Sequence, residues 1–217
     1  MTKIIAVLGN HRTGKSTLAK LIGELEGYTY ISLAAPVRSL LFKLCLDTDV
    51  YDGSKKNKVC AITKKRPRAI PASMWDTLVC ALPPDEENLT IGIMLKLLTE
   101  LFTPEHFHKI TAELMKEASA KNKDMVFVID DFRYISTLKF FRRRKAIVSY
   151  LWCPSNVSEY EYAALLAEPQ VRVSWCVDKE HDKYTFSSNA ITMSIKGQDI
   201  RVLKPVLDDI LLLGDTE

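Results

Sequence analysis

Apolar positions along the chain alternate between two spacings, one typical of buried strands and the other of amphipathic helices. Ile4–Leu8 is a continuous apolar run of the kind found in parallel strands that are buried on both faces. A helix is predicted next and should end at Gly27, after which Tyr28–Leu33 is typical of a short strand. Pro36 favours the start of a second helix. The helical spacing in these two segments is carried by Leu18, Leu21, Ile22, Leu25, Val37, Leu40, Leu41 and Leu44.

The same alternation returns in the second half of the chain. Strands are predicted over Met125–Ile129, Ala146–Trp152 and Ala190–Ile195, and a closing helix over Gln198–Leu213. A further helix is predicted over Ser155–Ala167. Repeated alternation of strands and helices indicates an α/β fold, a three-layer sandwich in which helices cover both faces of a parallel sheet.

Residues 47–90 interrupt this alternation, because Asp, Gly, Ser, Asn, Pro and Lys gather there around weak periodicity. We expect a single domain over residues 1–217, with 47–90 as an inserted lobe. Two helix starts follow, one at Thr90 and one at Thr103–Pro104. The face that the second of these helices is expected to bury consists of Phe107, Ile110 and Leu114.

The turn between the first strand and the first helix carries the most specific motif, Gly-Asn-His-Arg-Thr-Gly-Lys-Ser-Thr at residues 9–17. It fits the pattern G-x-x-x-x-G-K-[ST] between a strand and a helix, as a phosphate-binding loop requires. The loop amides would converge on a phosphate at the positive end of the helix. Lys15 would reach the β- and γ-phosphates of ATP, and the Ser16 hydroxyl would bind Mg²⁺. The residues expected to bind the nucleotide are Gly9, Asn10, His11, Arg12, Thr13, Gly14, Lys15, Ser16 and Thr17.

Composition is that of an ordinary globular protein, with 47% hydrophobic residues, 26% charged residues and a net charge of +3. So small a charge does not indicate a nucleic-acid partner. Five cysteines without a C-x-x-C pair favour free thiols in a reducing, cytoplasmic compartment. No apolar run approaches the roughly 20 residues of a membrane span. A homodimer is compatible with the sequence, which does not determine the oligomeric state.

The strand predicted before residue 130 ends in two carboxylates, Asp130 and Asp131. An acid at the carboxyl end of a sheet can hold Mg²⁺ beside a phosphate loop, and we assign this role to Asp131. A helix cap would suit an aspartate as well. Arg133 could clamp a phosphate or stabilise a transferring phosphoryl group, or it could form an ion pair with Asp131 that shapes the turn.

Further arginines are candidates for binding an acceptor. Arg38 lies in the first turn of the helix that begins at Pro36, where it could meet a phosphate or remain solvated. Lys55–Arg68 contains seven lysines and arginines and no acid, and it could fold over a phosphorylated substrate through Arg66 and Arg68. A solvated loop, a nuclear-localisation signal or a nucleic-acid patch is the alternative, although no aromatic residue lies in the run to stack on bases.

Three blocks of the sequence carry a resemblance: Gly9–Thr17, Leu33–Arg38 (Leu-Ala-Ala-Pro-Val-Arg) and Ile129–Arg133 (Ile-Asp-Asp-Phe-Arg). Together they resemble the phage-type deoxynucleoside monophosphate kinases, which belong to the nucleoside monophosphate kinase group. The resemblance implies a phosphate-loop kinase fold and the ATP-dependent phosphorylation of a (deoxy)nucleoside monophosphate. It also implies that Arg38 lies on the acceptor side, that Asp131 and Arg133 lie near the transferred phosphate, and that the 47–90 lobe carries specificity for the acceptor base.

Other functions remain open. Ile135–Arg142 is reminiscent of the animal-type phosphomevalonate kinases, which share the same three blocks, so phosphomevalonate is the alternative acceptor. A nucleotide-binding protein without kinase activity is a further alternative. Phosphoryl transfer needs an arginine on a closing lid. We assign the lid to about residues 155–188 and its arginine to Arg172, in the stretch that follows the predicted helix and lacks clear periodicity.

Overall fold

The fold is seen in a computed structural model that describes residues 2–8, 14–63, 65–68, 70–82, 89–130, 135–152, 172–178, 183–187, 192–196 and 199–213. The chain divides into two compact units. The first unit consists of Met1–Leu33 and Ala112–Glu217, and the second consists of Ala34–Thr111. The second unit therefore includes the segment 47–90.

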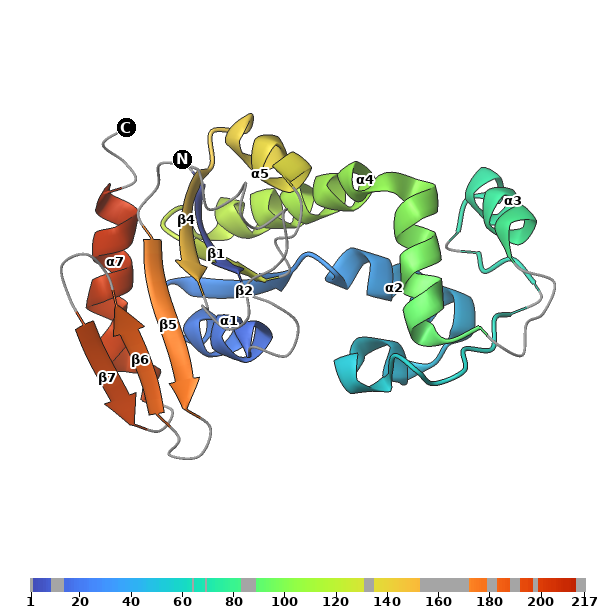
Figure 1. The fold of residues 1–217 in the computed structure, drawn as a ribbon. Helices are drawn as coiled ribbons and strands as arrows, with labels where there is room; N and C mark the ends of the chain where they lie inside the picture. Colours follow the sequence, from blue (N-terminus) through green and yellow to red (C-terminus); the bar gives the residue numbers. More distant parts are fainter. Residues whose placement is uncertain are drawn as a thin grey trace. The chain divides into compact units, whose positions relative to one another are not determined.

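The first unit is built on one sheet, whose strands are drawn as arrows in Figure 1. Its described strands are β1 (Lys3–Leu8), β2 (Tyr28–Ser32), β3 (Val126–Asp130), β4 (Ile147–Trp152), β5 (Arg172–Asp178), β6 (Lys183–Ser187) and β7 (Thr192–Lys196). They lie in the order β2, β3, β1, β4, β5, β6 and β7. Neighbouring strands from β2 to β5 are parallel, whereas β6 pairs antiparallel with both β5 and β7. The α/β class with a parallel sheet is therefore confirmed.

Helices cover both faces of this sheet. The described helices of this unit are α1 (Lys15–Gly23), the end of α4 (Ile91–Lys121), α5 (Ile135–Arg142) and α7 (Lys204–Leu213), with a short 3₁₀ helix, η4 (Ile200–Leu203), before α7. Because successive side chains of a strand point to opposite faces, Ile5 and Val7 pack with α1 and α7. Ile4, Ala6 and Leu8 pack with α5 and the end of α4. Burial on both faces explains the continuous apolar run, and the arrangement is compatible with a three-layer sandwich.

The predicted end of the first helix at Gly27 is wrong, because α1 ends at Gly23. A Cβ at Gly23 would lie 2.5 Å from the Cβ of Tyr30, so the end of α1 approaches β2 too closely for any side chain. Gly27 serves the turn into β2 instead. Its φ of 85° lies in the left-handed region that glycine adopts at little cost.

The second unit is mainly helical and has its own core. Its described elements are α2 (Ala35–Cys45), two 3₁₀ helices, η1 (Thr48–Tyr51) and η2 (Gly53–Lys55), α3 (Ala72–Ala81) and the first part of α4. Pro36 lies in the first turn of α2, as predicted. The buried core residues are Val37, Leu41, Leu44, Val50, Cys60, Ile70, Leu78, Leu89, Ile91, Met94, Leu98 and Phe107.

The two helix starts predicted at residues 90 and 103–104 fall within one kinked element. Thr90 caps the start of α4, because its hydroxyl accepts a hydrogen bond from the Ile93 amide at 3.3 Å. At Thr103 the backbone leaves helical geometry, with φ 59° and ψ 149°, and Pro104 follows within the helix. A proline cannot continue the hydrogen bonding of the preceding turn, so the interruption occurs where the sequence places it. None of the described helices has the length and apolar run that a membrane span requires.

The buried face predicted for the second part of α4 is wrong. Phe107 is buried, but Ile110 and Leu114 are 39% and 46% exposed. The buried stripe continues from Phe107 through Thr111 to Met115. Thr111 tolerates burial because its hydroxyl donates to the Phe107 carbonyl at 3.1 Å. The sequence also predicted a helix over residues 155–167, which lie outside the described part of the chain.

We expect Gly23→Ala to destabilise the first unit by about 1–3 kcal/mol, because the added methyl group overlaps the backbone of β2. Lys20→Ala, an exposed change on the same helix, is the matched control and should leave stability nearly unchanged. Urea unfolding followed by circular dichroism measures both. Equal stabilities for the two variants would contradict the close approach of α1 to β2.

Candidate functional site

The junction between β1 and α1 holds the described part of the predicted phosphate loop. Gly14 precedes α1 with φ 85° and ψ 8°, a left-handed conformation, and its carbonyl accepts from the Leu18 amide at 3.0 Å. A residue with a Cβ would pay about 1–2 kcal/mol for that conformation, so this position requires glycine. The other predicted loop residues, 9–13, lie outside the described part of the chain.

Lys15 is the first residue of α1 and is only 8% exposed, whereas Ser16 and Thr17 are exposed. Lysine is rarely buried to this degree. Its position is also unfavourable for a cation, because the amino end of a helix carries partial positive charge. A lysine at this position does not stabilise the helix dipole, so helix stability does not explain it.

Asp130 is the second buried charged group of this unit, at 3% exposure. It ends β3, next to β1 in the sheet. Val126 and Val128 pack on the side of α1, whereas Phe127 and Ile129 pack on the opposite side. Strand alternation therefore directs Asp130 towards the face that α1 covers.

Lys15 and Asp130 share one edge of the sheet. Among the described side chains, they are the buried lysine and the buried aspartate. Another buried ionisable side chain, His108, lies in the second unit, where burial lowers its pKa to about 4. Lys15 follows the carboxyl end of β1, and Asp130 forms the carboxyl end of the neighbouring β3. Open α/β sheets bind ligands at this edge, between neighbouring strands whose connections leave in opposite directions.

Trp175 is a residue of this site that the sequence gives no reason to expect. It is 1% exposed, and its Cη2 atom lies 3.6 Å from the position that a Cβ on Gly14 would take. The register explains the contact, because Leu8 lies opposite Trp152 and Trp152 opposite Ser174. Trp175 is therefore one residue beyond the level at which β1 ends. The indole packs against the glycine that begins α1.

Arg172, the arginine assigned to the lid, lies in a strand. Arg172 begins β5, where it pairs with Tyr150 of β4, so the stretch around it is a strand and is not irregular. The signal for this strand is the alternation of Val173, Trp175 and Val177. Two other assigned residues, Asp131 and Arg133, lie outside the described part of the chain.

Arg38, the candidate for binding an acceptor phosphate, lies in α2 of the second unit and is half-buried. Its guanidinium donates to the carbonyl of Val50 in η1. A guanidinium has five N–H donors, so this one contact leaves others available for a ligand. The contact also fixes the side chain between α2 and the loop that follows it.

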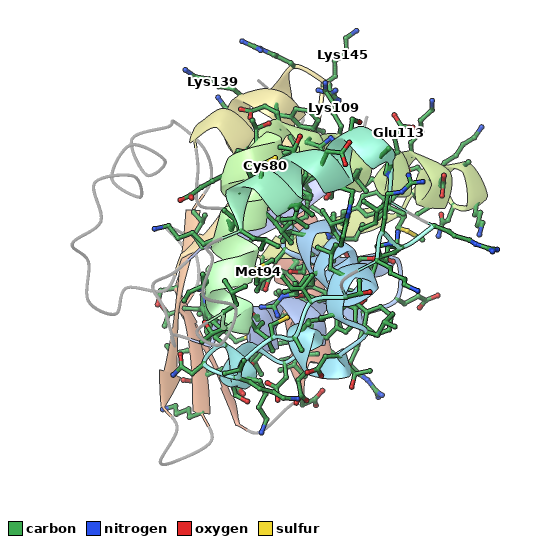
Figure 2. All side chains as sticks on the ribbon, turned by 90° about the vertical axis from the view of Figure 1, so that its right-hand side faces the viewer. Cys80, Met94, Lys109, Glu113, Lys139 and Lys145 are labelled. Atoms are coloured by element: carbon green, nitrogen blue, oxygen red, sulfur yellow. The ribbon has the colours of Figure 1, made fainter. Side chains whose placement is uncertain are left out.

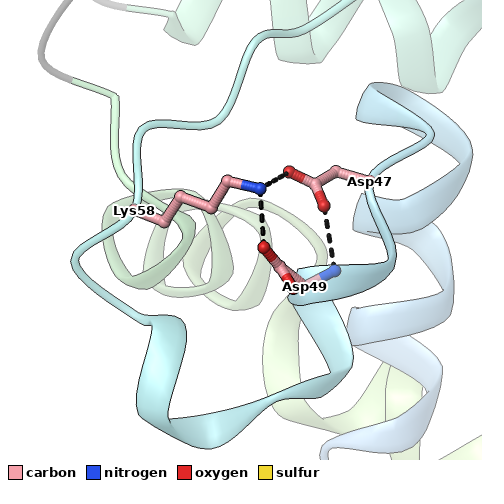
Figure 3. Close-up of polar contacts among 3 residues, drawn as sticks. All are labelled: Asp47, Asp49 and Lys58. Carbon is pink, nitrogen blue, oxygen red and sulfur yellow. Dashed lines mark hydrogen bonds and ion pairs between the residues drawn. The ribbon is translucent and has the colours of Figure 1, made fainter.

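The basic run at residues 55–68 divides into different roles. Lys58 donates to Asp47 Oδ2 at 2.8 Å and to Asp49 Oδ2 at 2.6 Å (Figure 3). These hydrogen bonds lower the pKa of Asp47 and raise the pKa of Lys58. Lys58 therefore holds the loop after α2. Arg66 is exposed and donates to the Ile70 carbonyl at 3.1 Å, and Arg68 is exposed.

The chemistry of the site is set by its donor types. Within the described ranges, no three His, Cys, Asp or Glu side chains gather into a metal-binding group. The Ser16 hydroxyl and the Asp130 carboxylate instead supply oxygen ligands, which Mg²⁺ prefers and binds alongside phosphate oxygens and water. In comparisons with known proteins, no protein-family model and no curated protein matches the chain.

We expect Gly14→Ala to weaken the binding of Mg²⁺·ATP roughly tenfold, the equivalent of about 1.4 kcal/mol of strain in the loop. The matched control is Gly27→Ala, because Gly27 has the same φ of 85° and open space around it. It should lose similar stability but retain nucleotide affinity. Isothermal titration calorimetry measures both variants.

A second variant tests whether Gly14→Ala acts through backbone strain or through crowding against Trp175. At 3.6 Å a methyl group on residue 14 meets the indole at an ordinary contact distance. Adding Trp175→Phe to Gly14→Ala should therefore restore no affinity. Recovery in the double variant would show that crowding, and not the left-handed backbone, causes the loss.

Proposed function

We propose that the protein is an ATP-dependent phosphotransferase whose acceptor is a (deoxy)nucleoside monophosphate. The observation that carries the proposal is the pair of buried charges, Lys15 and Asp130, at the carboxyl ends of two neighbouring parallel strands. Next to this pair, Gly14 adopts the left-handed conformation that starts α1. The family resemblance in the sequence points to the same reaction.

Lys15 and the amino end of α1 would hold the donor phosphates. The lysine supplies a full positive charge and the helix amides supply hydrogen-bond donors, so the two act on the same anion. Packing by Trp175 keeps Gly14, and with it the start of α1, in one position. A rigid cradle of this kind favours transfer because its donors need no rearrangement as charge develops.

Ser16 and Asp130 would hold Mg²⁺. The carboxylate ligand assigned from the sequence is Asp131 instead, and that assignment stays a prediction. Bound Mg²⁺ neutralises charge on the phosphates of ATP and orients them. Asp130 is supported by its direction, because strand alternation turns it towards the face of the sheet that α1 covers, and Ser16 lies in the first turn of α1.

The acceptor would be bound by the second unit through Arg38, with Arg66 and Arg68 as further cations. Arg38 is held by Val50, so it can present its remaining donors in a fixed direction. Arg133 is the candidate for stabilising the transferred phosphoryl group. A phosphate acceptor is already ionised at neutral pH, so direct in-line transfer requires no strong general base.

A coupled assay for ADP with a panel of acceptors tests this function. We expect ATP turnover that depends on one or more ribo- or deoxyribonucleoside monophosphates. Lys15→Ala should reduce kcat roughly 100-fold or more, because a fixed charge on the transferring phosphates is lost. The exposed Lys20→Ala on the same helix is the control and should keep normal activity. Circular dichroism checks that both variants are folded.

Three other outcomes would contradict the proposal in different ways. If phosphomevalonate were the only acceptor turned over, the protein would be a phosphomevalonate kinase and not a nucleotide kinase. ATP binding without acceptor-dependent ADP formation would identify a nucleotide-binding protein without kinase activity. Normal turnover in Lys15→Ala would remove the donor site.

We expect Asp130→Asn to raise the Mg²⁺ concentration needed for half-maximal activity at least about tenfold, because an amide is a weaker ligand than a carboxylate. Asp131→Asn is the matched comparison, since it makes the same change in the adjacent residue. Titration of activity with Mg²⁺ at saturating ATP measures both. If Asp131→Asn raised the required Mg²⁺ concentration more than Asp130→Asn does, Asp131 would be the metal ligand, as the sequence analysis predicted.

A further inference from the structure

Two cysteines of the second unit lie side by side. Cys45 is the last residue of α2, and Cys60 follows the isolated bridge between Val59 and Thr90. The Cys60 thiol donates a hydrogen bond to the sulfur of Cys45. Both are free thiols, with Cys60 only 1% exposed and Cys45 partly exposed. The two residues are neighbours in one apolar cluster, in which Cys60 is buried and Cys45 is partly exposed.

Backbone hydrogen bonds hold the two sulfurs in this position. The Cys60 amide donates to the Leu89 carbonyl at 2.6 Å, and the Thr63 amide donates to the carbonyl of Leu44, the neighbour of Cys45, at 2.9 Å. The connecting loop is bound at both ends as well, because Lys58 joins Asp47 and Asp49 (Figure 3). A disulfide requires two Cβ atoms about 3.8 Å apart, and a preformed sulfur contact removes most of the movement needed to reach that distance.

The surroundings give the two thiols different reactivity. The pKa of Cys45 is lowered to about 7, mainly by the hydrogen bond from Cys60, although burial opposes the shift. The Asp47 amide also donates to the Cys45 sulfur, while the Asp47 carboxylate opposes ionisation. The same hydrogen bond and burial raise the pKa of Cys60, which Lys58 lowers only slightly. Near neutral pH, Cys45 is therefore the nucleophile and Cys60 keeps its proton.

We propose that Cys45 and Cys60 form a thiol modification site that reacts with low-molecular-weight disulfides and closes to an internal disulfide. The Cys45 thiolate attacks one sulfur of the small disulfide, forming a mixed disulfide and releasing one thiolate. Cys60 then loses its proton to that thiolate or to solvent and attacks the Cys45 sulfur, releasing the second small thiol. The protein loses two electrons and two protons, and the small disulfide gains them as two thiols.

Closure would act on the part of the second unit that carries Arg38. The disulfide would join the end of α2 to the residue after the Val59–Thr90 bridge, and thus close a ring around residues 46–59. That ring contains Val50, whose carbonyl accepts from Arg38. The thiol chemistry depends only on the second unit and holds whether or not the protein is a kinase.

The experiment uses the full chain with oxidised glutathione as the probe, followed by intact mass and peptide mapping. In wild-type protein Cys45 and Cys60 should together lose two hydrogen atoms and appear in one cross-linked peptide, with no glutathione on either residue. Cys60→Ser should retain one glutathione on Cys45, because the resolving thiol is gone. Cys80→Ser is the control, since Cys80 is an exposed thiol on α3 (Figure 2), and it should behave as wild type.

A second measurement follows the rate of alkylation of Cys45 against pH. In wild type the rate should rise with a midpoint at about pH 7, because the thiolate forms as the pH passes the pKa. In Cys60→Ala, which removes the hydrogen-bond donor beside the Cys45 sulfur, the midpoint should move up towards that of an ordinary thiol, at roughly pH 8.5. Glutathione that stays on wild-type Cys45, a cross-link to Cys80, or equal midpoints in the two proteins would overturn the proposal. None of these readouts requires enzymatic activity.

Discussion

The parallel pairing of β1 with a strand on each side is the constraint on which the first unit depends. Lys3 lies opposite Val126 of β3 and also opposite Ile147 of β4, so the carboxyl ends of three strands reach the same edge. A shift of one residue in either pairing would exchange the two faces of a strand. Asp130 would then leave the side of α1, and the apolar residues of β3 would lose their partners in both layers.

The same register also places two ionisable side chains, Lys15 and Asp130, in buried positions. Burying a charge is unfavourable unless other charges or polar groups compensate for it. Lys15 and Asp130 are of opposite charge type, and they lie where the neighbouring strands β1 and β3 end. The buried Trp175 also lies at this edge, because it is one residue beyond the level at which β1 ends. Charges in such a buried position interact more strongly than charges in water, because the surroundings are less polarisable.

The sequence indicates most of the parallel sheet, and the exceptions have physical causes. β1 and β3 are buried on both faces, which leaves a continuous apolar run that composition alone reveals. In β5, apolar residues alternate with polar ones instead. The strand is therefore hard to distinguish in the sequence from the polar stretch around it. The face of α4 was misassigned because Thr111 is buried through a hydrogen bond that its residue type does not announce. Neither the contact of Trp175 with Gly14 nor that of Cys45 with Cys60 has a sequence signature, because both depend on segments that meet only after folding.

The division into two units separates two kinds of requirement. The phosphate edge depends on register and on a left-handed glycine, and both tolerate little change. The second unit has its own buried core, and its loop after α2 is held by an ion cluster, a guanidinium contact and paired thiols. Exposed ion pairs contribute little stability, so such a loop can vary in sequence without loss of the fold. The residue types that the sequence analysis singled out therefore lie in both units, Lys15 and Asp130 in the first and Arg38 in the second.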